Sequence, residues 1–268
     1  MITTNFHTHT TFCDGKDTPE EMVKAAIKKG FTTLGFSSHS YLSLKNDFSL
    51  TKQSEQEYIK EINRLKEKYK DDIKIFCGVE LEYYSPFPKY NYDYKIGSVH
   101  YVLKDGNYIP VDATWEIVKD AIDNLYGGNF NAYAEDYFAL ECDVLNRTKA
   151  DIIGHIDLLS KFCEKVDFKI TNRYLNAAQE CIKKLVPYGV PFEINTGAIS
   201  RGYRTTPYPS PEILKMIKLY GGKIVISSDC HNKDFLDCAF DKAVNLAINC
   251  GFSEHGIITE NGIEYIKF

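Results

Sequence analysis

Residues 5–37 of the chain, NFHTHTTFCDGKDTPEEMVKAAIKKGFTTLGFS, predict one complete strand–helix–strand unit. Residues 5–9 and 33–37 are short β-rich runs, and residues 19–29 between them have an amphipathic helical pattern. Thr18 can cap the helix, because Glu21 completes a capping box with it and Pro19 suits the first helical position. A helix between two strands favours a parallel pair, so this stretch indicates an α/β fold.

The same alternation continues through most of the chain. Further strands are expected at residues 73–79, 95–100, 151–155, 191–195 and 223–228. Further helices are expected at residues 53–70, 172–185, 211–219 and 235–250, with one or two more in residues 115–150, broken at Gly127-Gly128. Seven strands that alternate with helices favour a parallel sheet or barrel. Because no repeat or linker interrupts the pattern, a single domain over residues 1–268 is predicted.

Composition limits the kinds of partner. The 268 residues carry a net charge of −5, which argues against nucleic acid and favours a small anionic substrate in a local basic pocket. No run is long and apolar enough for a membrane span, and the amino end lacks the pattern of a signal peptide, so a soluble, cytoplasmic protein is predicted. The eight cysteines form no C-x-x-C pair and are expected to be reduced.

Six of the seven histidines fall at or just past the end of a predicted strand: His7, His9, His39, His100, His155 and His231. Parallel α/β proteins place their active sites at that end of the strands. A lone histidine is more often a core or surface residue than a ligand, but six that obey one positional rule indicate a shared metal site.

Three carboxylates accompany these histidines. Asp229 lies two residues before His231, as His7 lies two before His9, and residues two apart on a strand share a face. Glu80 directly follows an apolar run, so it can bridge ions at the strand ends or remain a solvated loop residue. Asp14, in an Asp-Gly pair, is either a ligand or a turn residue.

Seven ordered motifs carry a family resemblance: HTHTTFCDG from residue 7, SSH from 37, GVELEY from 78, GSVH from 97, GHID from 154, EINTG from 193 and SSDCH from 227. In this order, they resemble the polymerase-and-histidinol-phosphatase (PHP) superfamily over residues 6–231. The resemblance implies a distorted seven-stranded (β/α)7 TIM-like barrel, with two or three divalent ions at its mouth. It assigns His7, His9, Glu80 and Asp229 to one ion, Glu80, His100 and His155 to a second, and Asp14, His39 and His231 to a third.

The predicted chemistry is phosphate ester hydrolysis. Three divalent ions carry six positive charges, of which three carboxylates cancel three, and a phosphate monoester dianion with a hydroxide would neutralise the rest. The ions would generate a metal-bound hydroxide that attacks phosphorus, and Asp229 or His231 would protonate the leaving alkoxide. Nitrogen and oxygen ligands suit zinc, manganese or iron and do not choose among them.

The branch of the family is indicated by GSVHYV, Asp112, EINTGAISRG and YPSPEIL, which resemble histidinol-phosphate phosphatases of histidine biosynthesis. The resemblance implies that Arg201 binds phosphate, with Arg204 as a second candidate. Both arginines also fit solvated loop positions. Glu193 and Asn195 are expected either to support the ligand histidines or to contact the substrate amine.

Two other functions stay open from the residues. One is a different PHP phosphoesterase, acting on phosphotyrosine or on a small nucleotide, and the other is a non-catalytic metal-binding domain. The aromatic tract at residues 83–94 is mild support for the first, although a packed surface loop is favoured over a substrate wall.

Overall fold

The computed structural model describes residues 2–44, 46–166 and 170–268. Within them lies one nine-stranded sheet in the order β1-β2-β3-β4-β7-β8-β9-β10-β11, together with a separate β5–β6 hairpin. The strands are β1 (Thr4–Asn5), β2 (Thr33–Phe36), β3 (Lys74–Glu82), β4 (Tyr94–Ser98), β5 (Tyr101–Lys104), β6 (Asn107–Pro110), β7 (Ile152–Ile153), β8 (Phe192–Asn195), β9 (Ile224–Ser227), β10 (Glu254–Thr259) and β11 (Gly262–Lys267).

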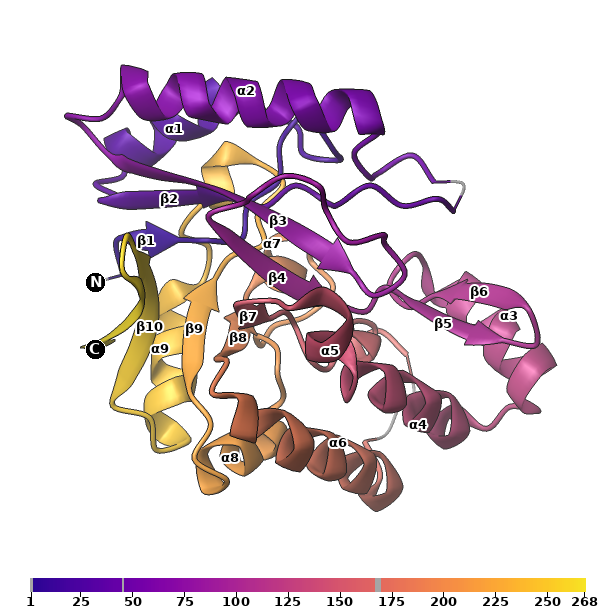
Figure 1. Ribbon diagram of the computed structural model, residues 1–268. Helices are drawn as coiled ribbons and strands as arrows, with labels where there is room; N and C mark the ends of the chain where they lie inside the picture. Colours follow the sequence, from indigo (N-terminus) through magenta and orange to yellow (C-terminus); the bar gives the residue numbers. More distant parts are fainter. Residues whose placement is uncertain (1, 45, 167–169) are drawn as a thin grey trace.

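Helices flank the sheet (Figure 1), with α1 and α2 beside β2 and β3, and α6 and α8 on the opposite side of the molecule. The α-helices are α1 (Pro19–Lys28), α2 (Lys52–Lys68), α3 (Trp115–Tyr126), α4 (Phe130–Glu141), α5 (Val144–Thr148), α6 (Asn172–Leu185), α7 (Gly197–Ser200), α8 (Pro211–Leu219) and α9 (Phe240–Asn249). Single 3-10 turns are η1 (Leu158–Ser160), η2 (Val186–Tyr188) and η3 (Lys233–Phe235). None of the helices described is both long and apolar enough to cross a membrane.

The first strand–helix–strand unit forms as its sequence predicts. Glu21 accepts the backbone N–H of Thr18 at 2.9 Å and donates its own N–H to the Thr18 hydroxyl at 3.3 Å, which completes the capping box. One face of α1 buries Met22, Val23 and Ala26 in the core. β1 and β2 pair in parallel.

The prediction of a closed seven-stranded barrel is not confirmed. Each of the seven predicted strands exists and pairs in parallel with the next, but β10 adds to the free edge of β9, and β11 pairs antiparallel with β10. At the carboxyl ends the first and last predicted strands do meet, because His9 donates its N–H to the carbonyl of Cys230 at 2.9 Å. The result is a mostly parallel α/β sheet whose hydrogen-bond ladder stays open among the described residues.

Several predicted boundaries were wrong. β1 ends at Asn5 instead of residue 9, because Thr8 leaves the sheet edge to bridge Cys230. Residues 115–150 hold three helices, of which the first ends at Gly127 in a left-handed conformation. The last predicted helix starts at Phe240, since η3 and Ala239, with φ of +55°, precede it. The two hairpins β5–β6 and β10–β11 were not predicted.

The Tyr94 side chain packs below the carboxyl ends of β1 and β2. Its buried hydroxyl donates to the carbonyls of Phe6 at 2.6 Å and Phe36 at 3.0 Å, which ties β4 to the ends of β1 and β2, across the intervening β3. A Cβ at Gly35 or Gly78 would meet the Tyr94 side chain at 2.4 or 2.3 Å, so glycine is needed where β2 and β3 pass the ring. The aromatic ring thereby separates the sheet interior from the polar site above it.

Candidate metal centre

All nine predicted ligands come together at the carboxyl ends of the strands. They follow or end β1, β2, β3, β4, β7 and β9, and most are fully buried. The strands are largely apolar, and the ligands lie at, near or just past their carboxyl ends, where parallel α/β sheets place their active sites. The nine are His7, His9, Asp14, His39, Glu80, His100, His155, Asp229 and His231.

The innermost group surrounds a single point. His7 Nε2 lies 3.3 Å from Glu80 Oε2, and His9 Nε2 lies 3.3 Å from Asp229 Oδ1. His7 Nε2, His9 Nε2 and Glu80 Oε2 are buried and make no hydrogen bond, although Glu80 Oε2 lies within ion-pair distance of His39. Such atoms are costly to bury unless something binds them. A divalent cation at about 2.1 Å from each would satisfy them, so the residues fit a metal ion.

Glu80 faces a second group with its other oxygen. Its Oε1 lies 2.9 Å from His155 Nε2 and 3.4 Å from His100 Nε2, and accepts the Ser98 hydroxyl at 2.8 Å. Its Oε2 also lies 2.9 Å from His39 Nδ1. One carboxylate thus faces both sets of histidines that the family resemblance assigns to separate ions.

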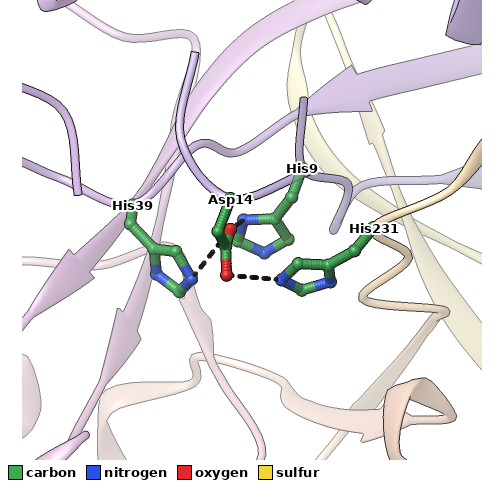
Figure 2. A group of neighbouring side chains, drawn as sticks. All are labelled: His9, Asp14, His39 and His231. Carbon is green, nitrogen blue, oxygen red and sulfur yellow. Dashed lines mark hydrogen bonds and ion pairs between the residues drawn. The ribbon is translucent and has the colours of Figure 1, made fainter. Parts of the chain in front are cut away.

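A third group forms around Asp14 (Figure 2). Asp14 Oδ2 lies 3.1 Å from His231 Nε2, and Oδ1 lies 3.6 Å from both His39 Nε2 and His9 Nδ1. The family assignment gave His9 to the first ion only, whereas the ring here faces both groups. Burial, with the His231 and His39 rings beside it, lowers the pKa of His9 to about 3, so this ring is neutral, as a metal ligand must be.

Two buried glutamates contact the Nδ1 atoms of ligand histidines, on the side of each ring that faces away from the other ligands. Glu193 Oε1 lies 2.7 Å from His7 Nδ1, and Glu82 Oε2 lies 2.9 Å from His100 Nδ1. A carboxylate on the far nitrogen fixes the orientation of the ring and raises its basicity. Sequence reasoning missed Glu82, although its position two residues after Glu80 on β3 placed it on the same face of the strand.

Glu193 and Asn195 support ligands instead of lining open space. Glu193 Oε2 accepts the backbone N–H of His155 at 3.0 Å and the Asn195 amide at 3.0 Å. The same amide lies 3.2 Å from Asp229 Oδ2, and its oxygen accepts the N–H of Gly197. Of the two predicted roles, these contacts favour support of the metal ligands over contact with the substrate amine.

Charge around Glu80 is strongly coupled. Burial alone would raise the pKa of its carboxyl, but the histidine rings, His7 and His39 above all, hold that pKa well below its usual range. Conversely, Glu80 and then Glu82 outweigh burial and raise the pKa of His100 to about 10. The ionised Glu80 carboxylate is therefore stabilised by positive charge around it, which divalent ions would also supply.

Arg201 lies beside this centre. Its Nη2 donates to Asp229 Oδ2 at 3.0 Å, and its Nη1 lies 3.3 Å from His231 Nδ1. Burial would raise the pKa of Asp229, but the Arg201 guanidinium and then His7 hold it well below the ordinary value. The arginine directly follows α7 and is one of the residues that line the cleft beside the centre.

Arg204, the second predicted phosphate ligand, is placed differently. It is 6% exposed and donates to the Ser160 hydroxyl, to the Ser160 carbonyl at 3.4 Å and to Thr206 at 3.2 Å. Its guanidinium stacks over the Tyr208 ring at 4.7 Å. It is not among the residues that line the cleft over the metal centre, so its contacts favour a structural role.

The cleft over the metal ligands has a volume of about 400 Å³ and walls of mixed character. Arg201 and Lys161 supply positive charge, and Lys161 pairs with Asp112 at 3.1 Å. The rings of Phe48 and Tyr101 stack with centroids 6.4 Å apart. Sequence reasoning did not single out Lys161, Phe48 or Tyr101, because no local pattern marks them as neighbours of the metal ligands.

The fold and the clustered histidines and carboxylates define an α/β protein whose residues could hold metal ions at the carboxyl ends of its strands. A family model described as the PHP domain matches residues 5–197, and the chain belongs to this family. The family resemblance inferred from the seven motifs is thereby confirmed.

Relatives and solved structures agree with this family. The chain is 32% identical over 255 residues to a "Probable histidinol-phosphatase" of Schizosaccharomyces pombe, covering 87% of this chain and 81% of the relative. It is 25% identical to the histidinol-phosphatase of Bacillus subtilis, covering 88% and 96% of the two chains. The histidinol phosphate phosphatase of Lactococcus lactis, solved with zinc, L-histidinol and phosphate, shares the fold at a TM-score of 0.71 and 22% identity, with 98% of each chain covered.

Proposed function

We propose that this protein is a metal-dependent phosphomonoesterase of histidine biosynthesis that hydrolyses L-histidinol phosphate to L-histidinol and phosphate. The observation that carries the proposal is the convergence of three buried ligand atoms that make no hydrogen bond, on His7, His9 and Glu80, beside a cleft that contains an arginine. The named relatives and the ligands of the Lactococcus protein support the choice of substrate. Two or three divalent ions, zinc, manganese or iron, are the proposed cofactors.

When bound, the ions would polarise the phosphoryl oxygens and lower the pKa of a coordinated water. The chain's own residues do the rest. The Arg201 fork can hold two phosphoryl oxygens and offset the negative charge that builds as the ester bond breaks. Of the two predicted proton donors, which both contact Arg201 at the edge of the cleft, His231 is the proposed donor to the leaving alkoxide, because Arg201 and His7 hold the pKa of Asp229 well below its ordinary value.

The cleft also suits the rest of this substrate. Histidinol phosphate carries an ammonium group and a flat imidazole ring. Asp112 and Asp47 line the cleft and can face an ammonium, and the stacked rings of Phe48 and Tyr101 offer an aromatic wall. A small monoester with one cationic group therefore matches the lining. Cytoplasmic location, a single domain and the absence of nucleic-acid binding stay predictions.

The test compares three phosphate esters on the purified protein: histidinol phosphate, a phosphotyrosine peptide and a nucleoside bisphosphate. We expect kcat/KM for histidinol phosphate to exceed both others, and complete chelation to abolish turnover. Comparable turnover of either competitor would redirect the assignment to another phosphoesterase of the family. Full activity after chelation would remove metal dependence altogether.

A further inference from the structure

The third ligand group depends on two loops that come from opposite ends of the chain. Asp14 lies on the loop after β1, and His231 lies on the loop after β9. Backbone bonds join the two loops, since Lys16 donates its N–H to the carbonyl of His231 at 2.8 Å. The first loop is also closed on itself, because Thr11 donates its N–H to the carbonyl of Asp17 at 3.0 Å.

The Asp17 side chain connects the loop after β1 to the loop after β9. The residue is 6% exposed, and its Oδ2 accepts the backbone N–H of Lys233 at 2.9 Å. Its Oδ1 pairs with the Lys233 ammonium. Both carboxylate oxygens are therefore used between the loops, and neither faces a metal ligand. The Asp17 carboxylate is buried and the Lys233 side chain is 37% exposed, so the ion pair alone is partly screened, but the added backbone bond fixes the register of the two segments.

Precise loop spacing matters most for Asp14. Its side chain is one-third exposed, and it reaches His231 at 3.1 Å and His39 at 3.6 Å, across the loop junction. Metal ligands must converge within a few tenths of an ångström to bind an ion tightly. A shift between the two loops would separate Asp14 from His231, whereas most of the inner ligands lie within or close to the ends of the strands and should move less.

We propose that Asp17 is a positioning residue that, through Lys233, sets the affinity of the Asp14–His39–His231 group for its divalent ion. The inference rests on the proposed function, because that function requires ions at these groups. It also distinguishes the three ions. Two are held by residues near strand ends. The third depends on the contacts between Asp17 and Lys233, which we call the clamp.

The experiment measures zinc bound per chain at buffered free Zn²⁺, together with thermal unfolding of the metal-free protein. The variants are Asp17→Ala, which removes both contacts, and Asp17→Asn and Lys233→Met, which remove the ion pair alone. We expect wild-type protein to bind three ions. In Asp17→Ala, the affinity for one ion should fall about tenfold to a hundredfold, with the other two unchanged. The ion-pair variants should show a smaller loss of the same ion.

Asp237→Asn is the matched control. It breaks the 2.6 Å pair between Lys29 and Asp237, which also joins the first strand–helix unit to the last part of the chain but contacts none of the ligands. This variant should bind three ions as the wild type does. Excess Zn²⁺ should restore kcat in the Asp17 variants, which a purely structural defect would not allow.

Three results would overturn the clamp: Asp17→Ala with wild-type affinity for all three ions, equal weakening of all three, or only two ions in the wild type. Should Asp17→Ala fail to fold, Asp17→Asn and Lys233→Met decide the question by the same measurement. If the wild type binds three ions but does not hydrolyse histidinol phosphate, the proposed function fails and the clamp stands.

Discussion

Glu80 is the residue that connects the inner ligand groups. Its two oxygens face different sets of histidines, at 3.3 Å from His7 and 2.9 Å from His155. Ser98 and the buried setting fix the carboxylate in this orientation. An uncharged amide of the same shape would present one oxygen and one N–H group, so it could not bind two cations.

Glu80→Gln should therefore remove metal and activity together. We expect kcat for histidinol phosphate to fall by about a hundredfold or more, because loss of a shared ligand should cost at least as much as loss of its supporting partners. Metal content per chain and steady-state kinetics measure the effect. His255→Gln is the control, since His255 lies outside the metal centre, stacked on Phe268. A three-ion, fully active Glu80→Gln protein would contradict the bridging role.

The two arginines should differ in what their loss affects. Arg201→Lys keeps the charge beside Asp229 but loses the planar fork, so kcat/KM should fall about tenfold to a hundredfold with stability unchanged. Arg204→Ala should instead lower the free energy of unfolding by about 1–3 kcal/mol, because it leaves the buried partners at Ser160 unsatisfied. Kinetics and urea unfolding on both variants separate the roles. An Arg204→Ala protein with raised KM and unchanged stability would restore its predicted phosphate contact.

At the scale of elements, α4 carries an uncompensated acid in the core. Glu141 is fully buried, and its Oε1 accepts the Tyr137 hydroxyl at 2.7 Å, while Oε2 has no hydrogen-bond partner. Burial raises the pKa of Glu141 well above its ordinary value. The folded state thus binds a proton that the unfolded chain releases near pH 4.5, so the stability associated with this group is present below that pH and lost as pH rises toward the folded pKa.

Glu141→Gln should remove that pH dependence. The amide needs no proton to remain neutral, so we expect the variant to be more stable than wild type at pH 8 by about 1 kcal/mol, with little difference at pH 4. Urea unfolding at both pH values measures the change. A larger difference at pH 4 than at pH 8 would show that the carboxyl is ionised in the folded protein.

The elements that could be predicted are those with local signals. Helices α6 and α8 match their predicted ranges, because amphipathic spacing and a capping Thr171 or an initial Pro211 mark them within the sequence. β1 was predicted too long because its apolar residues could not reveal that Thr8 pairs with Cys230. The β10–β11 hairpin was missed because no strand was predicted after SSDCH, the last of the seven motifs, and both strands lie beyond it.

At the scale of the whole molecule, the metal centre joins strands from both ends of the chain. Ligands before residue 40 and after residue 228 share one site, so bound ions link the first and last parts of the sheet. We therefore expect folding and metal binding to be coupled.

Removal of metal should weaken the whole fold. A ligand that binds only the native state stabilises it by about 2.7 kcal/mol when present at a hundred times its dissociation constant. We expect chelation to lower the unfolding temperature, and added Zn²⁺ or Mn²⁺ to restore it, in calorimetry at fixed pH. Asp229→Asn should show a reduced response to metal. An unfolding temperature that is the same with and without chelator would contradict the coupling.

The sequence by itself predicted which side chains gather at one site, because a polar residue near the end of a strand is a local pattern, from which His7, His9, Glu80, His155 and Asp229 could be named as candidates. Only the tertiary structure decided the open edge beyond β9, the support from Glu82, the Asp17–Lys233 pair and the walls of the cleft. These features depend on contacts between residues far apart in the chain, and such contacts leave no periodicity or spacing in the sequence.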